Sequence, residues 1–119
     1  MIVGVGVDIA TVTRVERALQ RWPRFAGRCF TAAERAYCDC RRRAAAHYAV
    51  RFAAKEATAK ALGGRFAWHE VEVIAGTPQP ALRVAGRAGV ALGDAHAHLS
   101  LSHDGDHAVA VVVVERARS

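Results

Sequence analysis

The chain has 119 residues, of which 52% are hydrophobic, so it can form one domain with a core and is too apolar to be disordered. Its longest apolar run, Ala108 to Val114, falls far short of the roughly 18 residues that a transmembrane helix needs. The net charge of +6 favours an anionic partner, whether a nucleic acid, an acidic protein or a phosphorylated small molecule.

The cysteines and the N-terminus predict a cytoplasmic protein. Three cysteines are too few for a disulfide scaffold, and the N-terminus lacks the basic region and cleavage site of a signal peptide. A zinc site formed by Cys38, Cys40 and His47 would be spaced poorly, because residues two apart on a helix point in different directions.

The first predicted element is a strand from Met1 to Asp8, in which Gly4 and Gly6 alternate with apolar residues. The glycines lie within the strand and lack the third glycine of a dinucleotide-binding motif. They therefore indicate close packing of the backbone rather than a phosphate loop.

A helix with a basic side is expected next, capped by Thr11 or Thr13 and ending at Trp22 before Pro23. Its apolar side consists of Val12, Val15, Leu19 and Trp22. Its basic side consists of Arg14, Arg17 and Arg21. Such a side is usually only solvated, but charge of one sign favours docking of an acidic partner. Nucleic acid would also fit, although aromatic residues make up only 7% of the chain and no nucleic-acid-binding motif is present.

The rest of the chain completes an α+β pattern. Thr31 and Glu34 form a capping box that opens a second helix through Cys40, and a third helix over residues 44–62 ends at a glycine pair. The later elements are a strand at His69–Ile74, turn residues at 77–80, a strand at Ala81–Ala85, a helix at Gly86–Gly93 and a hairpin of His98–Ser102 and His107–Glu115. The order β-ααα-ββ-α-ββ predicts a single α+β domain over residues 1–119, with helices packed on a mostly antiparallel sheet. The last strand is apolar throughout and is expected to be central and covered on both faces.

The helix over residues 44–62 has charged residues in two places. At about 100° per residue, its one continuous polar stripe consists of His47, Arg51, Lys55 and Thr58. Glu56 and Lys60 lie about 100° or more from that stripe, among alanines and Phe52. An exposed pair four residues apart would need no explanation. A pair displaced from the solvated side indicates a functional site, because an unpaired buried charge is costly.

Asp8 at the end of the first strand offers a partner for this pair. Asp8 and Glu56 would supply the two carboxylates with which Mg²⁺ is commonly held beside substrate phosphates, and Lys60 could contact a phosphate. A strand-end or capping aspartate is the plain alternative for Asp8, because spacing alone does not bring the two carboxylates together. His103 is either an anion contact or a turn residue beside Asp104 and Gly105.

These residues fall into blocks that resemble the holo-[acyl-carrier-protein] synthases, the small bacterial class of 4′-phosphopantetheinyl transferases. The blocks span most of the chain, and they are residues 2–10 with Arg14, residues 28–34, residues 51–62, and residues 98–103 with 108–110. The resemblance implies the 4′-phosphopantetheinyl transferase fold. It also implies transfer of 4′-phosphopantetheine from coenzyme A to a serine of an apo acyl carrier protein, with release of adenosine 3′,5′-bisphosphate, in fatty acid biosynthesis.

The resemblance further implies roles for particular residues. Asp8, Glu56 and Lys60 would be catalytic, with Asp8 and Glu56 binding Mg²⁺ and Lys60 contacting the diphosphate. Arg51 and His103 would contact the 3′-phosphate end of coenzyme A.

The partners implied are an acidic carrier protein, which would meet Arg14 and Arg21, and further copies of the chain in a homotrimer with active sites between subunits. Neither nucleic acid nor a membrane is expected as a partner. The alternative function is a noncatalytic module of the same fold that binds coenzyme A or a carrier protein, against which the joint presence of Asp8, Glu56 and Lys60 argues.

Overall fold

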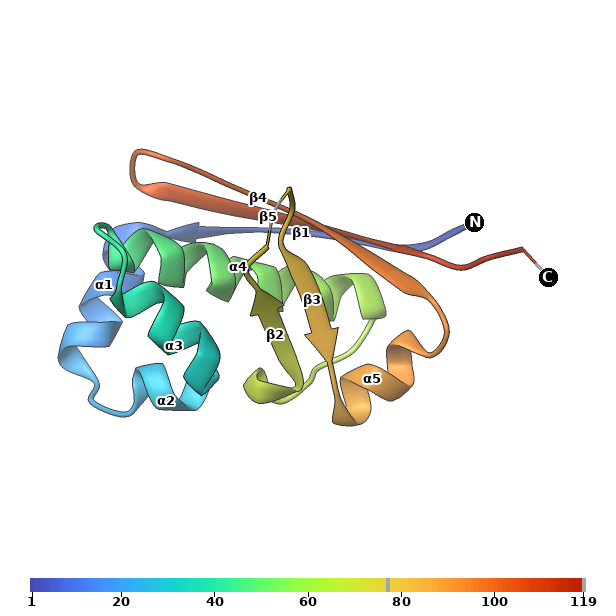
Figure 1. Cartoon of the computed structure of the whole chain (residues 1–119), viewed down its shortest axis with the longest axis horizontal. Coiled ribbons are helices and arrows are strands. Elements are labelled where there is room, and N and C mark those ends of the chain that lie inside the picture. The colour runs from blue at the N-terminus through green and yellow to red at the C-terminus, as the bar shows by residue number, and fades with distance from the viewer. Residues whose placement is uncertain (77, 119) are drawn as a thin grey trace.

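The computed structural model describes residues 1–76 and 78–118, which form an α+β fold (Figure 1). The strands are β1 (Ile2–Thr11), β2 (Val71–Ile74), β3 (Ala81–Val84), β4 (His96–Asp104) and β5 (His107–Glu115). The helices are α1 (Val12–Arg21), α2 (Phe25–Cys29), α3 (Ala32–Asp39), α4 (Ala44–Leu62) and α5 (Gly86–Leu92), with a 3₁₀ turn η1 (Trp68–Glu70). The predicted α+β class is confirmed, and Thr77, within the predicted turn at 77–80, lies outside the described residues.

Two antiparallel sheets lie against the long helix α4. The larger sheet has the order β1-β5-β4, and the smaller sheet pairs β2 with β3. Figure 1 shows the helices gathered on one side of the larger sheet, with α4 running along it. The core lies in this layer and includes the alternate residues of β5 that face α4, namely Ala108, Ala110, Val112 and Val114.

The two glycines of β1 allow the strand to lie directly on α4. A Cβ atom added to Gly4 would overlap the carbonyl oxygen of Ala61, and one added to Gly6 would overlap that of Ala57. The close packing predicted from these glycines is therefore confirmed. Because side chains alternate along a strand, Asp8 continues the row of Gly4 and Gly6 and faces the same side as they do.

The position of β5 is confirmed only in part. It is the central strand, as its continuous apolar sequence predicts. It is covered by α4 on one face, but no described segment of this chain covers the other face (Figure 1). On that outer face Val5, Val7 and Ile9 of β1 are 61%, 51% and 65% exposed. The prediction that both faces are covered is wrong for the single chain.

Short elements and element ends differ most from the expectation. The sequence pattern does not reveal α2, because a five-residue helix is too short to show a period. β1 extends to Thr11 because Thr11 still pairs with His107 of β5. Trp22, predicted on the apolar side of the first helix, lies beyond the end of α1 and is 59% exposed.

Among the described residues, no helix is both long enough and apolar enough to cross a membrane.

Candidate active site

The site begins with an ion pair between β1 and α4. Lys60 Nζ lies 2.9 Å from Asp8 Oδ1 and also donates to the carbonyl oxygen of Val7 at 3.0 Å. The side chains of Lys60 and Asp8 are 54% and 20% exposed, so the pair is open to solvent. These two contacts use two of the three N–H donors of the ammonium group, and the remaining donor is available to a phosphate oxygen.

Glu56 joins this pair from the preceding turn of α4. Residues four apart on a helix lie about 40° apart around its axis, so Glu56 and Lys60 share one side. Glu56 is partly exposed and lines a pocket of about 230 Å³ with Arg65, Phe66 and Trp68. The structure thus brings Asp8, Lys60 and Glu56 to one flank of α4.

The predicted orientation of α4 is wrong. The polar stripe that was expected to face solvent is largely buried, with Arg51 at 4%, Lys55 at 3% and Thr58 at 1% exposure. Glu56 and Lys60, expected away from solvent, are instead the more accessible charged residues of the helix. The reason is that α3 and β2 pack over the polar stripe while β1 covers an alanine side, so the polar residues do not mark the solvated side.

Lys55 is stabilised by a buried partner that the sequence pattern did not assign to it. Lys55 Nζ lies 2.8 Å from Glu34 Oε1, and both side chains are at most 2% exposed. Lys55 also donates to the carbonyl oxygens of Trp68 and Val71. Burial lowers the pKa of Lys55, and the Glu34 carboxylate offsets part of that shift.

Glu34 has the capping role predicted for it and two further contacts. It accepts the N–H of Thr31 at 2.9 Å while Thr31 Oγ1 accepts the N–H of Glu34, which completes the predicted capping box. Glu34 Oε2 also accepts the N–H of Val73 in β2 at 2.8 Å. One carboxylate therefore joins α3, α4 and β2, and it is not available to a substrate.

Asp8 and Glu56 suit Mg²⁺ by the chemistry of their donors. Both offer hard carboxylate oxygens, and Asp8 is directed towards α4 by the row of Gly4 and Gly6. Within residues 1–76 and 78–118 there is no cluster of three or more His, Cys, Asp or Glu side chains that could enclose a metal ion. Mg²⁺ does not require such a cage, because it commonly keeps several waters and binds one or two carboxylates together with substrate phosphates.

A second pocket, of about 230 Å³, lies between α3, α4 and the end of β4. It is lined by Arg51, His47, His103 and Tyr37, together with Ser102 and apolar residues, and no carboxylate is among the described residues that line it. Arg51 lies over the ring of Tyr37, with its Cζ 4.3 Å from the ring centre. Its Nε atom is buried and has no hydrogen-bond partner among the described residues.

The environment of this pocket is one that favours an anion. A buried guanidinium nitrogen without a partner is costly, and an anionic oxygen would satisfy it. Burial lowers the pKa of His47, and the positive charges of Arg51 and His103 lower it further. Arg51 and His103, which are far apart in the sequence, are thus brought together, and His47 and Tyr37 are pocket residues that the sequence pattern did not assign.

The basic side of α1 is exposed beside an apolar hollow. Arg14 and Arg21 are both exposed, and Arg14 lines a pocket of about 300 Å³ that also includes Ile9, Phe25 and Phe52. Ala10, which also lines this pocket, is two residues beyond Asp8 on the same face of β1, so the pocket lies next to the Asp8–Lys60 pair along the strand. The structure therefore puts an apolar surface with a basic rim close to the candidate reaction centre.

The fold is that of small phosphopantetheine-transferring enzymes. Residues 4–112 match the profile of the 4′-phosphopantetheinyl transferase superfamily, to which the chain therefore belongs. The chain is 47% identical over 126 residues to the holo-[acyl-carrier-protein] synthase of Anaeromyxobacter dehalogenans, with 98% of each chain covered. It is 49% identical over 120 residues to the synthase of Frankia casuarinae, with 96% of this chain and 98% of the relative covered.

A solved structure supports the same assignment. The holo-(acyl-carrier-protein) synthase of Bacillus anthracis, determined in complex with CoA (3′,5′-ADP), is 34% identical with a TM-score of 0.84, covering 98% of this chain and 99% of that one. The resemblance to the holo-[acyl-carrier-protein] synthases is thereby confirmed, and the chain is a transferase of this group.

Proposed function

We propose that the protein transfers 4′-phosphopantetheine from coenzyme A to a serine hydroxyl of an apo acyl carrier protein, with Mg²⁺, and releases adenosine 3′,5′-bisphosphate. The observation that carries the proposal is the open Asp8–Lys60 ion pair, with Glu56 one turn before Lys60 on the same side of α4. Relatives that bear the synthase name cover nearly the whole chain, which supports the same reaction.

The reaction is an in-line displacement at the β-phosphorus of coenzyme A, in which catalysis is mostly positioning and neutralisation of charge. Asp8 and Glu56 would hold Mg²⁺, which supplies positive charge beside the diphosphate oxygens. Lys60 donates its remaining N–H to a diphosphate oxygen and keeps Asp8 oriented through the 2.9 Å contact. Glu56 accepts the proton of the attacking serine, directly or through a water molecule.

The pocket of Arg51 and His103 receives the 3′-phosphate end of coenzyme A in this proposal. Its support is the absence of carboxylates among the described lining residues and the buried Arg51 Nε atom that has no partner there. A phosphate would form charge-assisted hydrogen bonds with Arg51 and His103. The Bacillus anthracis synthase, whose structure contains CoA (3′,5′-ADP), supports a nucleotide ligand for a protein of this fold.

Arg14 and Arg21 bind the acidic carrier protein. Reversing both charges should raise the KM for the carrier protein and leave the KM for coenzyme A unchanged, because coenzyme A is assigned to other residues. Steady-state kinetics with each substrate varied in turn measures both constants. Equal changes in the two KM values would contradict the docking role.

The uncovered outer face of the β1-β5-β4 sheet supports assembly into a homotrimer with active sites between subunits. Its exposed apolar side chains, including Val5, Val7 and Ile9, would be covered by further copies of the chain.

The reaction is expected in the cytoplasm, which agrees with three cysteines that are all free.

The test is the intact mass of an apo acyl carrier protein after incubation with this protein, coenzyme A and Mg²⁺, beside a sample with EDTA. A gain of one phosphopantetheine group only in the presence of the metal is expected. No gain with any of several apo carriers, from a protein shown to be folded, would favour a noncatalytic binding module instead.

A further inference from the structure

The basic helix α1 begins without a cap of its own. Its N-cap residue, Thr11, makes no side-chain capping hydrogen bond, and its first turn contains no acidic residue. The first N–H groups of a helix have no partner within the helix, and the helix dipole makes this end positive. A ten-residue helix with neither a side-chain cap nor an acidic first turn is only marginally stable by itself.

The missing cap comes from the turn between β4 and β5. Asp106 Oδ1 accepts the N–H of Thr13 at 2.9 Å, and Asp106 Oδ2 accepts the hydroxyl of Thr13 at 2.8 Å. The backbone oxygen of Asp106 accepts the N–H of Val12 at 2.8 Å. A residue 93 positions away in the sequence therefore satisfies the start of α1 and puts a carboxylate at its positive end.

This turn also belongs to the neighbourhood of the anion pocket. His103, which lines that pocket, is paired with Ala108 in the β4–β5 ladder, on either side of the turn. Gly105 has a positive φ of 58°, which allows the tight turn, and its carbonyl oxygen accepts a hydrogen bond from Arg43. One hairpin thus adjoins both the pocket assigned to coenzyme A and the helix assigned to the carrier protein.

We propose that Asp106 is a positioning residue for the carrier protein: by capping α1 it fixes the first turn, and with it Arg14, relative to the Asp8–Lys60 pair. The inference rests on the proposed function, in which Arg14 meets the carrier. Arg14 directly follows Thr13, so a loosened first turn displaces its guanidinium group first. The body of α1 should remain folded, because Val12 and Val15 are buried and the backbone contact of Asp106 does not depend on its side chain.

The sign of the effect separates this role from simple electrostatics. An acidic partner is repelled by Asp106, so removing its charge should strengthen carrier binding if charge alone mattered. If capping matters, Asp106→Ala should weaken carrier binding although it removes a repulsive charge. Asp106→Asn removes the same charge but keeps an oxygen acceptor, and asparagine is as good a cap as aspartate.

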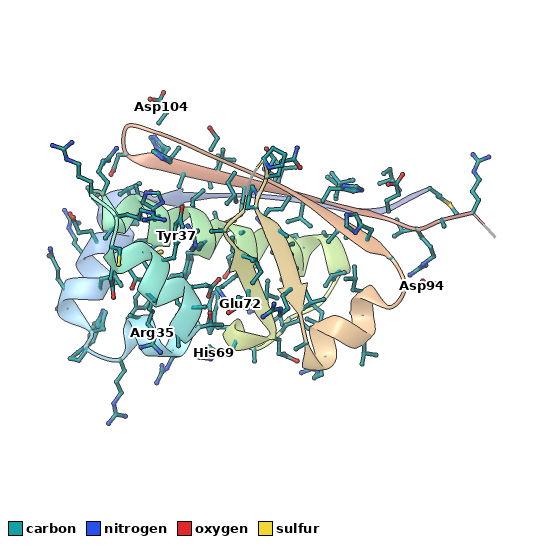
Figure 2. The ribbon with its side chains drawn as sticks, in the orientation of Figure 1. Arg35, Tyr37, His69, Glu72, Asp94 and Asp104 are labelled. Atoms are coloured by element: carbon teal, nitrogen blue, oxygen red, sulfur yellow. The ribbon has the colours of Figure 1, made fainter. Side chains whose placement is uncertain are left out.

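Asp104 provides a matched control on the same hairpin. In Figure 2 it projects from the tip of the β4–β5 hairpin, away from the helices. Asp104→Ala removes one negative charge there and leaves the contacts between Asp106 and Thr13 intact. Its carrier KM should stay the same or fall.

The experiment measures kcat and both KM values, with intact apo carrier protein, for the wild type, these three variants, Thr13→Val and the double variant Asp106→Ala/Thr13→Val. For Asp106→Ala we expect a rise of about threefold to tenfold in the carrier KM, from the usual size of a capping interaction. Its kcat and coenzyme A KM should be unchanged, and Asp106→Asn should be close to the wild type. Thr13→Val, which loses only the hydroxyl contact, should raise the carrier KM less than Asp106→Ala does. In the double variant the two effects should not add, because both substitutions remove the same contact between Thr13 and Asp106.

The results that would overturn the inference differ from a failure of the proposed function. An unchanged carrier KM in Asp106→Ala, equal rises for both substrates, or an Asp106→Asn variant as weak as Asp106→Ala would each overturn it while the wild type still transfers. Absence of transfer by the folded wild type would overturn the proposed function, and the inference with it.

Discussion

The two flanks of α4 carry similar charged groups in opposite environments. On one flank, Lys55 and Glu34 are sealed under α3 and β2, with side chains at most 2% exposed. On the other flank, Lys60 and Asp8 form an ion pair of nearly the same length that remains open to solvent. A buried pair fixes the positions of the elements that carry it, whereas an open pair contributes little to stability and is free to rearrange around a substrate. The same residue types therefore build the scaffold on one side and the candidate reaction centre on the other.

Breaking the buried flank should have the largest effect. Glu34→Gln leaves Lys55 buried beside a neutral group, and its single carbonyl oxygen can accept from Thr31 or from Val73 but not from both. This change should lower the free energy of unfolding by about 3–5 kcal/mol. Chemical denaturation measures this loss. The double variant Glu34→Gln/Lys55→Met should recover part of it, because the uncompensated charge is gone. A double variant as unstable as the sum of the single variants would show that the charges do not interact.

Breaking the open flank should abolish the reaction and leave the fold intact. Glu56→Gln should lower turnover at least a hundredfold, which corresponds to about 2.7 kcal/mol of transition-state stabilisation. The reason is that a neutral amide replaces the carboxylate that is proposed to hold Mg²⁺ and to accept the serine proton. The mass assay follows turnover, and circular dichroism checks the fold. Activity like that of the wild type would remove Glu56 from the site.

The open ion pair itself should matter little for stability. Lys60→Met should change the free energy of unfolding by less than about 1 kcal/mol, because an exposed pair is screened by solvent. It should nevertheless reduce transfer strongly. A loss of stability comparable to that of Glu34→Gln would end the distinction between the two flanks.

A smaller effect should appear in the pH dependence of stability. Burial and the charges of Arg51 and His103 hold the pKa of His47 below its usual value, so the folded chain binds fewer protons than the unfolded chain between the two pKa values. The free energy of unfolding therefore rises with pH across that window, and the contribution is lost as pH falls below the usual histidine value of about 6.5. His47→Gln should reduce this slope between pH 7 and pH 5. An unchanged slope would assign the titration to other histidines.

The sequence predicts local features of this molecule better than its long-range ones. The capping box of Thr31 and Glu34 and the close packing at Gly4 and Gly6 depend on neighbouring residues or on the absence of a side chain, and both predictions are confirmed. The orientation of α4 could not be obtained in this way. When a helix is covered on several sides, its polar residues can be buried if other elements supply partners for them. Lys55 is buried because Glu34 pairs with it, so its position does not mark the solvated side of α4.

The long-range contacts at the site could not be predicted from the periodicity of the sequence either. Asp8 and Lys60 are 52 residues apart and come together because β1 packs on α4. Asp106 and Thr13 are 93 residues apart and come together through the pairing of β1, β5 and β4. The residue pattern singled out Asp8, Glu56 and Lys60, the family resemblance assigned roles to them, and the structure adds the contact between Asp8 and Lys60. Their individual roles in catalysis stay predictions.

The contact of β1 with α4 has a consequence for how the chain tolerates mutation. Gly4 and Gly6 carry no functional group, yet any side chain there would push the strand off the helix and move Asp8 away from Lys60. The distance between β1 and α4 is therefore set by the absence of a Cβ atom at Gly4 and Gly6. In a library covering all substitutions of β1, the positions without a side chain should prove as intolerant as the aspartate that they place.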